Sequence, residues 1–321
     1  MDLPFLTGLD VSEKRVLLRL DLDTAHDPSD LRIKSSFETL DFLKEKGASE
    51  ITILAHKGRP DGKVVEELSL TPFQPIFDKW GAKIHENLRF DRREENNDSE
   101  FAKELAGLGD VYINEAFASS HREHASIVGI PKILPHALGF RFQKEVENLS
   151  KVFDNPQRPL IFIISGLKQD KLDYVKSFEN IADKILIGGR LPELMGDKAL
   201  ESIRTQSGKV LIGNLVMDKE DITLNTIERF EKELGGAGTI VVSGPLGKFE
   251  DEGHRQGTEK VLYAVTNTSA FKIAGGGDTE AAISTFNLSS KFDWISVGGG
   301  AMLEFLSKKT LPGIEAMKDV A

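Results

Sequence analysis

Short runs of aliphatic and β-branched residues recur along the whole chain and predict its strands. Continuous apolar runs of this length are typical of strands buried on both faces, as in a parallel sheet. Four runs lie in the first half: RVLLRLDLD, EITILAH, KIHENL and VYINEA. Six lie in the second half: LIFIIS, KILIGG, KVLIGN, TIVVSG, FKIAGG and WISVGG. We therefore predict ten strands in two groups.

Amphipathic stretches lie between these runs and predict helices. Examples are SSFETLDFLKEKG at 35–47 and LNTIERFEKELGG at 224–236. In the first stretch Phe37, Leu40 and Leu43 fall on or near one helical face, and Gly47 provides a C-terminal stop. The alternation of strands and helices predicts right-handed βαβ units and an α/β architecture.

The chain is long enough for two domains. It has 321 residues, which allows two cores of ordinary size. The stretch FRFQKEVENLSKVF predicts a helix, and the two prolines of DNPQRP end it before the next strand. We expect a boundary near residues 140–160 and two α/β domains joined by this helix.

The charge balance limits the ligands that the protein can bind. The formal net charge is -10, and acidic residues outnumber basic ones in both halves. A nucleic-acid partner is therefore not expected, and any bound anion should be small and held locally. The absence of cysteine excludes disulfides, thiolate metal sites and cysteine nucleophiles.

Nothing in the sequence predicts a membrane partner. No apolar run approaches the roughly 20 residues that cross a bilayer. The start, MDLPFLTGLDVSEKR, has no basic segment followed by an apolar stretch, so it does not predict a signal peptide. We expect a cytoplasmic protein.

In the first half, basic side chains follow the ends of the predicted strands. Ligands of open parallel sheets bind beyond these ends. The residues concerned are Asp21 and Asp23, Arg32, His56 with Arg59, Asn87 with Arg89, and Asn114 leading to His121, Arg122 and His124. Guanidinium groups bind phosphate and carboxylate bidentately, and histidines add titratable donors. The set favours a small phosphorylated carboxylate as ligand, although each residue alone could be an ordinary surface charge.

In the second half, most predicted strands end in glycine. The segments are SGLK, IGGR, VSGPLG, AGGGDT and VGGGA. Glycine permits positive φ and a close approach of ligand to backbone N–H groups, and a following helix start favours phosphate. Asp278 could hold Mg²⁺ beside a phosphate. Each loop alone could be a tight turn. Neither the G-x-G-x-x-G pattern nor the P-loop spacing is present.

Together these motifs resemble one family, the phosphoglycerate kinases, in order along nearly the whole chain. VLLRLDLD is similar to the R-V-D-F-N motif of that family, and AHKGRP to S-H-L-G-R-P. ENLRF is identical to the form in the family, and VYINEAFASSHREHAS parallels V-Y-V-N-D-A-F-G-T-A-H-R-A-H-A-S. SGPLGKFE, GGGDT, GGGAMLEFL and LPGIEA follow in family order. The chain is shorter and more divergent than usual for the family.

The resemblance implies a fold and a reaction. The fold would be two doubly wound parallel-sheet domains, Rossmann-like, with a central cleft and a hinge helix. The 3-phosphoglycerate domain would span 1–145, the nucleotide domain 146–305, and a segment at 306–321 would return to the first domain. The reaction would be reversible phosphoryl transfer between 1,3-bisphosphoglycerate with ADP and 3-phosphoglycerate with ATP, in glycolysis and gluconeogenesis. A monomer that uses Mg²⁺ is implied.

The resemblance also implies site residues, taken position by position. Those that bind 3-phosphoglycerate would be Asp21, Asp23, Arg32, His56, Arg59, Arg89, His121, Arg122 and His124. Those that act on the transferring phosphoryl group would be Arg32, Lys168, Gly298, Gly299 and Gly300. The nucleotide site would comprise Ser165, Gly166, Lys168, Lys171, Gly188, Gly189, Ser243, Gly244, Pro245, Gly247, Glu250, Gly275, Gly276, Gly277, Asp278 and Thr279. Asp278 would bind the Mg²⁺.

The sequence departs from the family pattern mainly in the nucleotide half. An asparagine of the first-half pattern is Asp23, which should weaken anion binding unless an arginine neutralises it. Lys168 and Lys171 are three residues apart instead of four, which in an α-helix would rotate one of them by roughly a quarter turn. Arg190 and Ser243 replace a glycine and an asparagine, and the chain is shortened between Gly189 and Asp221.

Three hypotheses follow from this comparison. The first is an active, compact phosphoglycerate kinase. The second is a catalytically impaired homologue that binds 3-phosphoglycerate or a related phosphorylated acid. The third is an enzyme whose nucleotide preference has changed, because the loops on the adenine side differ most.

Overall fold

The computed structural model describes residues 3–195 and 208–318 and divides the chain into two compact units. Unit 1 comprises Met1–Glu147 and Thr310–Ala321, and unit 2 comprises Asn148–Lys309. Unit 1 is therefore assembled from two separate stretches of sequence. In the described part of the chain, no helix is long and apolar enough to cross a membrane.

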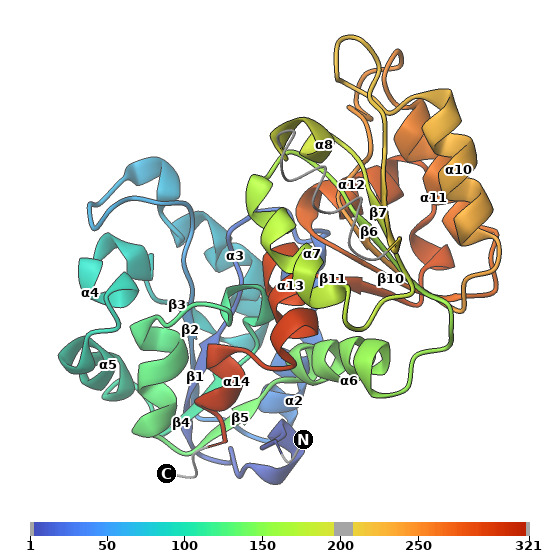
Figure 1. Cartoon of the computed structure of the whole chain (residues 1–321). Helices are drawn as coiled ribbons and strands as arrows, with labels where there is room; N and C mark the ends of the chain where they lie inside the picture. Colours follow the sequence, from blue (N-terminus) through green and yellow to red (C-terminus); the bar gives the residue numbers. More distant parts are fainter. Residues whose placement is uncertain (1–2, 196–207, 319–321) are drawn as a thin grey trace. The chain divides into compact units, whose positions relative to one another are not determined.

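Unit 1 is built on a five-stranded parallel sheet with the order β3-β2-β1-β4-β5 (Figure 1). Its strands are β1 (Arg15–Arg19), β2 (Glu50–Leu54), β3 (Lys83–Ile84), β4 (Val111–Asn114) and β5 (His136–Leu138). The four predicted strands are present. The predicted number is nevertheless wrong by one, because β5 has only three residues and begins with a histidine, so no apolar run marks it.

The helices of unit 1 include α2, which lies within the amphipathic stretch predicted at 35–47. They are α1 (Leu31–Lys34), α2 (Phe37–Glu45), α3 (Gln74–Phe77), α4 (Arg92–Glu95), α5 (Ser99–Ala106) and α14 (Pro312–Glu315). Within α2 the side chains of Leu40 and Leu43 are fully buried in the core cluster of the unit. Gly47, just beyond the end of α2, has a φ of 75°, as a glycine stop requires.

Unit 2 contains a six-stranded parallel sheet with the order β11-β10-β9-β6-β7-β8. Its strands are β6 (Leu160–Ile164), β7 (Lys184–Ile187), β8 (Val210–Ile212), β9 (Thr239–Ser243), β10 (Phe271–Gly275) and β11 (Trp294–Ser296). Its helices are α7 (Val175–Phe178), α8 (Leu191–Leu194), α10 (Leu224–Leu234), α11 (Gln256–Thr266), α12 (Gly277–Thr285) and α13 (Gly299–Lys308). All six predicted strands are confirmed.

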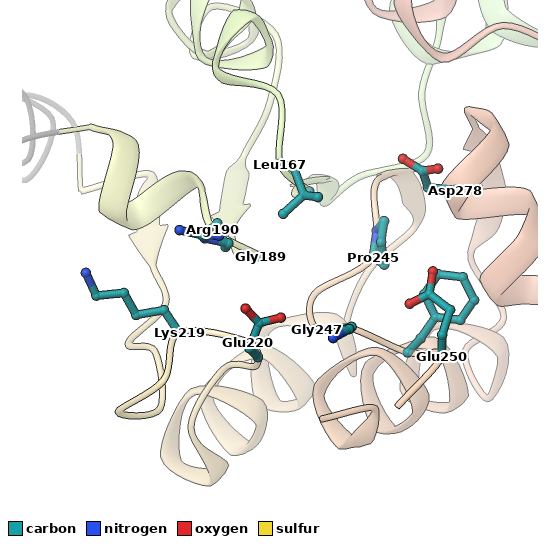
Figure 2. Close-up of a pocket in the computed structure, with 12 residues that line it drawn as sticks. Leu167, Gly189, Arg190, Lys219, Glu220, Pro245, Gly247, Glu250 and Asp278 are labelled. Atoms are coloured by element: carbon teal, nitrogen blue, oxygen red, sulfur yellow. The ribbon is translucent and has the colours of Figure 1, made fainter. Parts of the chain in front are cut away.

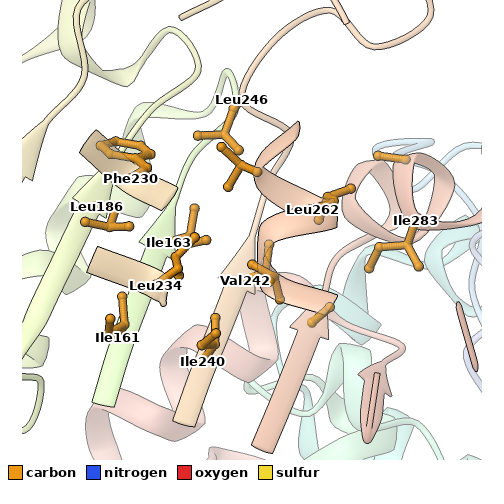
Figure 3. Packing of buried hydrophobic residues seen from close by; sticks show 14 of the residues in the cluster. Ile161, Ile163, Leu186, Phe230, Leu234, Ile240, Val242, Leu246, Leu262 and Ile283 are labelled. Carbon is orange, nitrogen blue, oxygen red and sulfur yellow. The ribbon is translucent and has the colours of Figure 1, made fainter. Parts of the chain in front are cut away.

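The sheet of unit 2 is buried on both faces. Ile161 and Ile163 of β6 belong to a core cluster that includes Phe230 of α10 (Figure 3). Phe162, between them in the strand, points to the opposite face and stacks on Phe178 with 4.3 Å between ring centroids. This burial explains why the strands are continuous apolar runs. The predicted fold class, two doubly wound α/β domains, is confirmed.

Helix α6 (Phe140–Asp154) begins within unit 1 and ends within unit 2. The buried carboxylate of Glu115, at the end of β4, accepts hydrogen bonds from the backbone N–H groups of Arg141 (3.1 Å) and Phe142 (3.0 Å) in the first turn. Thr39 of α2 donates a third hydrogen bond to this carboxylate. Glu115 therefore ties the start of α6 to the sheet. Burial raises its pKa to about 7.

Candidate functional site

In each sheet, successive strands are added first on one side of the first strand and then on its other side. This change of side occurs at β1 in unit 1 and at β6 in unit 2. In unit 1, β1 lies between β2 and β4, so consecutive connections run to opposite sides. In unit 2, β6 and β9 are neighbours in the same way. Ligands of doubly wound sheets bind at such reversals, beyond the carboxyl ends of the strands. Most predicted site residues lie at these two points.

In unit 1, Asp21 joins the segments that follow β1 and β4. Its carboxylate accepts a hydrogen bond from the backbone N–H of Ala118 (2.7 Å) and another from the hydroxyl of Ser119. The segment held in this way continues directly into His121 and Arg122. Asp21 therefore positions the loop that carries the basic residues. Both of its carboxylate oxygens accept hydrogen bonds from the protein itself.

Arg19, the last residue of β1, is a site residue that the sequence analysis missed. It is fully buried, and its Nη2 lies 2.8 Å from Nδ1 of His56. A guanidinium group can only donate, so Nδ1 accepts and the proton of the neutral ring lies on Nε2. Nε of Arg19 donates to the hydroxyl of Ser126 (2.9 Å), which donates to the buried carboxylate of Glu94 (2.6 Å). The sequence analysis did not identify Arg19 because it lies within an apolar run.

The two buried histidines of the cluster are not titratable near neutral pH, contrary to the prediction. Burial, reinforced by Arg19 and Arg89, holds the pKa of His56 well below its usual value. Burial, Arg89 and Arg19 likewise lower the pKa of His124 to about 3. Both rings therefore act as neutral hydrogen-bonding groups. His121 is half-buried and accepts a hydrogen bond from Nε of Arg122 at 3.4 Å.

The arginines of unit 1 carry positive charge that the protein only partly compensates. Arg89 is 1% exposed; its Nη1 donates to the carbonyl of Gly58 (2.7 Å) and its Nε lies 3.2 Å from Glu95. Burial, followed by repulsion from Arg122, lowers the pKa of Arg89 to about 10. Within the described residues, Nη2 of Arg89 has no hydrogen-bond partner.

Arg122 and Arg59 belong to the same positive region. Burial lowers the pKa of Arg122, and the charge of exposed Arg59 lowers it further. Like charges held together in this way are stabilised when an anion binds between them.

The side chain of Arg32 contacts the backbone of Asp23. Arg32, half-buried at the start of α1, donates from Nη1 to the carbonyl oxygen of Asp23 (2.6 Å). The carboxylate of Asp23 accepts from the backbone N–H of Gly58 (2.8 Å). Its negative charge also partly opposes the lowering, mainly by burial, of the pKa values of Arg89 and Arg122. The expected electrostatic cost of Asp23 is therefore offset by neighbours within unit 1.

In unit 2, the crevice is formed mainly by backbone. Ser165 follows β6; its N–H donates to the carbonyl of Ser243 (2.8 Å), and its hydroxyl donates to the carbonyl of Pro245 (2.6 Å). Gly244 has a φ of 105°, and a Cβ there would lie 1.9 Å from the carbonyl oxygen of Ser165. Only glycine fits this crossing. The hydroxyl of Ser243 is buried and has no partner among the described residues.

The two lysines behind this crevice are related by one turn of 3₁₀ helix. Lys168 precedes the helix Gln169–Tyr174, and the N–H of Lys171 donates to the carbonyl of Lys168 (3.3 Å). Residues three apart align in a 3₁₀ helix, whereas four apart align approximately in an α-helix. Lys168, however, lies before this helix with an extended backbone, so the helical alignment applies only from Gln169 onward; Lys168 is exposed and Lys171 half-buried.

Lys171 is half-buried, and its side chain contacts the glycine crossing. Its Nζ donates to the carbonyl oxygens of Ser165 (2.7 Å) and Ser243 (3.2 Å). Burial lowers its pKa to about 8, while the charge of Asp278 raises it. The ammonium group therefore stabilises the crossing and leaves part of its charge uncompensated.

The helices α12 and α13 begin next to each other. A Cβ on Gly299 would lie 2.8 Å from Cα of Gly276, so the two starts meet at glycines. The hydroxyl of Thr279 accepts from the N–H of Gly244 (2.8 Å) and donates to the carbonyl of Gly275 (2.9 Å). The N-terminal N–H groups of α12, preceded by Gly276 with a φ of 105°, remain suited to a phosphate.

A pocket of about 480 Å³ lies at the reversal point of unit 2 (Figure 2). Its lining is Gly166, Leu167, Gly189, Arg190, Lys219, Glu220, Pro245, Gly247, Lys248, Phe249, Glu250 and Asp278. Six of these are predicted site residues: Gly166, Gly189, Pro245, Gly247, Glu250 and Asp278. The other predicted members of the nucleotide site, among them Gly188 and Gly277, do not line it, and neither do Gly298 and Gly300, which were predicted to act on the transferring phosphoryl group.

Glycines behind this lining allow close packing. A Cβ on Gly188 would lie 2.5 Å from Cδ2 of Leu246, and a Cβ on Gly275 would lie 2.6 Å from Sδ of Met302. These positions support the crevice without forming its surface.

The rim of the pocket carries charged residues that the sequence analysis did not assign. Arg190 donates to Glu193 from Nε (3.2 Å) and Nη2 (3.0 Å), and Lys219 donates to the same carboxylate (2.7 Å). They come from the stretch in which the family pattern is lost, so no motif marked them. The shortened stretch itself includes 196–207, which lie outside the described residues.

Asp278 is the carboxylate of the pocket that the sequence analysis predicted as the metal ligand. Within the described residues there is no group of three histidine, aspartate or glutamate side chains arranged to hold a metal. Magnesium is commonly bound by one or two carboxylates together with substrate phosphates. Asp278, in the first turn of α12, fits that arrangement.

Comparison with known sequences identifies one family. A family model described as phosphoglycerate kinase matches residues 6–85, 81–206 and 197–309. A phosphoglycerate kinase from Moorella thermoacetica is 34% identical and covers 98% of each chain. One from Herpetosiphon aurantiacus is 34% identical and covers 96% of this chain and 97% of its own. The first alignment spans 388 positions, so this chain of 321 residues lacks segments of that relative.

Solved structures give the same result. Phosphoglycerate kinase from Coxiella burnetii has a TM-score of 0.82 at 28% identity, covering 98% of this chain and 99% of its own. Phosphoglycerate kinase from Pyrococcus horikoshii has a TM-score of 0.83 at 25% identity, covering 98% of both chains.

Proposed function

Since this chain belongs to the phosphoglycerate kinase family, its activity is reversible phosphoryl transfer between 1,3-bisphosphoglycerate and 3-phosphoglycerate, and we propose which residues perform it. The acceptor in the reverse direction is the carboxyl group of 3-phosphoglycerate, and the nucleotide pair is ATP and ADP. The second hypothesis, an impaired homologue, has no support from the comparisons.

The observation that carries the assignment is the uncompensated positive charge at the reversal point of unit 1. Arg89 and Arg122 both have lowered pKa values, and each disfavours the charge of the other. An anion with a phosphate and a carboxylate would relieve this repulsion. We assign 3-phosphoglycerate binding to Arg32, Arg59, Arg89, Arg122, His56, His121 and His124, with Asp21 and Asp23 positioning the surrounding loops.

The transferring phosphoryl group is assigned to Arg32, Lys168 and the N–H groups of Gly298, Gly299 and Gly300. Phosphoryl transfer requires alignment of donor and acceptor, together with stabilisation of charge on the group in flight. The two cations and the N-terminus of α13 supply that stabilisation.

We propose that the two units close about α6 during turnover and exclude water, which would otherwise hydrolyse the acyl phosphate.

The nucleotide is assigned to the pocket of unit 2. Its phosphates are held at the start of α12 by Lys171 and Thr279, and its ribose by Glu250. Ser243, Gly244 and the other predicted glycines shape the crevice. Asp278 would hold Mg²⁺, which when bound neutralises charge on the phosphates. On the resemblance to the family, we extend the proposal to a cytoplasmic monomer of glycolysis and gluconeogenesis.

The test is transfer from Mg-ATP to 3-phosphoglycerate, followed by coupled consumption of the product. We expect Arg32→Ala and Lys168→Ala to reduce kcat by roughly a hundredfold or more, because each removes charge stabilisation in the transition state. Arg255→Ala, at a half-buried position, and Lys291→Ala, at an exposed one, both in unit 2, are the controls and should retain activity. Absence of transfer by the natural chain, with 3-phosphoglycerate still bound in calorimetry, would establish the impaired homologue instead.

A further inference from the structure

The pocket of unit 2 has two chemically different ends (Figure 2). Asp278 and the start of α12 form one end, which suits phosphates and a cation. Arg190, Lys219 and Glu220 lie at the other end. If the phosphates bind beside Asp278, as proposed above, the nucleobase must extend toward Glu220. The composition of that end therefore decides which base is accepted.

The cations at the base end are already neutralised within the protein. Glu193 of α8 accepts from Arg190 through one carboxylate oxygen and from Lys219 through the other. Figure 2 shows the amine of Lys219 directed away from the pocket. Neither cation is therefore positioned to bind an added anion.

Glu220 presents a carboxylate to the same space. Its backbone is fixed, because its N–H donates to Asp218 (3.2 Å) and its carbonyl accepts from the N–H of Lys248 (2.9 Å). Its half-buried side chain points up into the pocket between Leu167 and Gly247. No other described residue forms a hydrogen bond or ion pair with this carboxylate. It is an available acceptor at the base end.

The walls beside Glu220 suit a flat ring. Gly166, Gly189 and Gly247 contribute no side chains beyond Cα, while Leu167 and Pro245 contribute apolar surface. The side chain of Leu167 is 70% exposed, so a ring stacked against it would remove apolar surface from water.

We propose that Glu220 reads the hydrogen-bond donors of the purine and that this enzyme uses guanine nucleotides at least as well as adenine nucleotides. A carboxylate only accepts hydrogen bonds. Guanine presents two adjacent donors, N1–H and the exocyclic amine, which match two carboxylate oxygens in a bidentate, charge-assisted pair. Adenine presents one donor beside an acceptor, N1, which would face the second oxygen unfavourably. The inference rests on the proposed placement of the nucleotide.

The natural chain should therefore use Mg-GTP with a kcat/KM equal to or greater than that for Mg-ATP, measured with saturating 3-phosphoglycerate. A bidentate base contact discriminates by roughly tenfold or more. Mg-ITP, whose base keeps N1–H but lacks the exocyclic amine, should fall below Mg-GTP.

The decisive variant is Glu220→Gln, because an amide presents one acceptor and one donor. That pattern matches adenine and not guanine, so the ratio of kcat/KM for GTP to that for ATP should fall by roughly tenfold, because guanine loses a bidentate partner and adenine gains one. Glu228→Gln, on the exposed face of α10, makes the same charge change outside the pocket and should leave the ratio unaltered. Calorimetry with Mg-GDP and Mg-ADP provides the same comparison without turnover.

Two results would overturn the inference. One is a natural chain that strongly prefers ATP, with a ratio that Glu220→Gln does not change. The other is an equal loss with both nucleotides in Glu220→Gln, which would mean that Glu220 contacts the ribose or only supports its loop. In both cases transfer from ATP persists in the natural chain, whereas failure of the proposed function would abolish transfer from every nucleotide.

Discussion

The two units share a topology but form their sites from different materials. In unit 1 the reversal point is filled with side-chain charge: Arg19, His56 and Arg89 are buried there. In unit 2 the equivalent point is formed by backbone, where Gly244 crosses Ser165 and Gly276 meets Gly299. The same sheet edge can therefore recognise an anion through buried cations or through N–H groups and helix starts. The first solution depends on charge balance, and the second on the absence of a Cβ.

The largest effect should come from removing the buried cation of unit 1. Arg19→Met removes the stronger of the two arginine charges that stabilise buried Glu94, so the free energy of unfolding should fall by about 3–5 kcal/mol. Denaturant titration measures this loss. Arg15→Met, at the exposed start of the same strand, removes a solvent-screened ion pair to Asp110 and should cost far less than Arg19→Met. Equal losses in the two variants would show that burial of Arg19 adds nothing.

In unit 2, adding a single methyl group at the glycine crossing should have the next largest effect. Gly244→Ala places a Cβ 1.9 Å from the carbonyl oxygen of Ser165 at a φ of 105°, so unfolding free energy should fall by about 3 kcal/mol and nucleotide binding should be lost. Gly236→Ala has no atom within 4 Å of the new Cβ and is the matched control. Retained nucleotide affinity in Gly244→Ala would contradict a site formed by backbone.

A further effect should appear in the pH dependence of stability. The pKa of Glu115 rises from 4.5 to about 7 in the folded chain, so the native state binds the proton more tightly than the unfolded state. The contribution of Glu115 to stability is therefore full below pH 4.5 and is lost as the pH rises through about 7, by roughly 3 kcal/mol. Glu115→Gln should flatten this part of the curve. An unchanged slope in that variant would assign it to other groups.

The smallest effect should be a difference in how the affinities for nucleotide and for 3-phosphoglycerate depend on pH. Lys171 has a pKa of about 8, so nucleotide affinity should fall about tenfold between pH 7 and 9 as its charge is lost. Affinity for 3-phosphoglycerate should stay nearly constant over this range, because His56 and His124 remain neutral and Arg89 remains charged. Calorimetry measures both. Lys171→Arg should remove the alkaline loss, and its persistence there would exclude Lys171 as the cause.

Most of the fold could be predicted from the sequence, because strands buried on both faces must be apolar along their length. Ile161, Phe162 and Ile163 show this directly, since adjacent residues enter opposite cores. The strand β5 could not be found, because three residues beginning with His136 leave no periodic signal. It is recognised as a strand only in the structure, from its hydrogen bonds to β4.

The site could be predicted where a strand end exposed its chemistry, and not where burial hid it. Arg19 occupies a strand position between apolar residues, so its role depends on contacts with distant His56 and Ser126. The spacing of Lys168 and Lys171 could be counted, but the 3₁₀ geometry of the helix that contains Lys171 could not be predicted from it. Glu220 lies where the motifs end, and only the pocket lining reveals it.

The division of unit 1 into two stretches has a consequence for its biosynthesis. Residues from Thr310 onward follow the whole of unit 2 in sequence, yet Gly313 donates to the carbonyl of Ser120 (2.9 Å) and Nε2 of His136 lies 3.2 Å from the carbonyl of Met317. A ribosome therefore makes the last piece of the first unit only after the entire second unit. Unit 2 is the part that can finish folding during translation, while unit 1 waits for its closing segment to emerge.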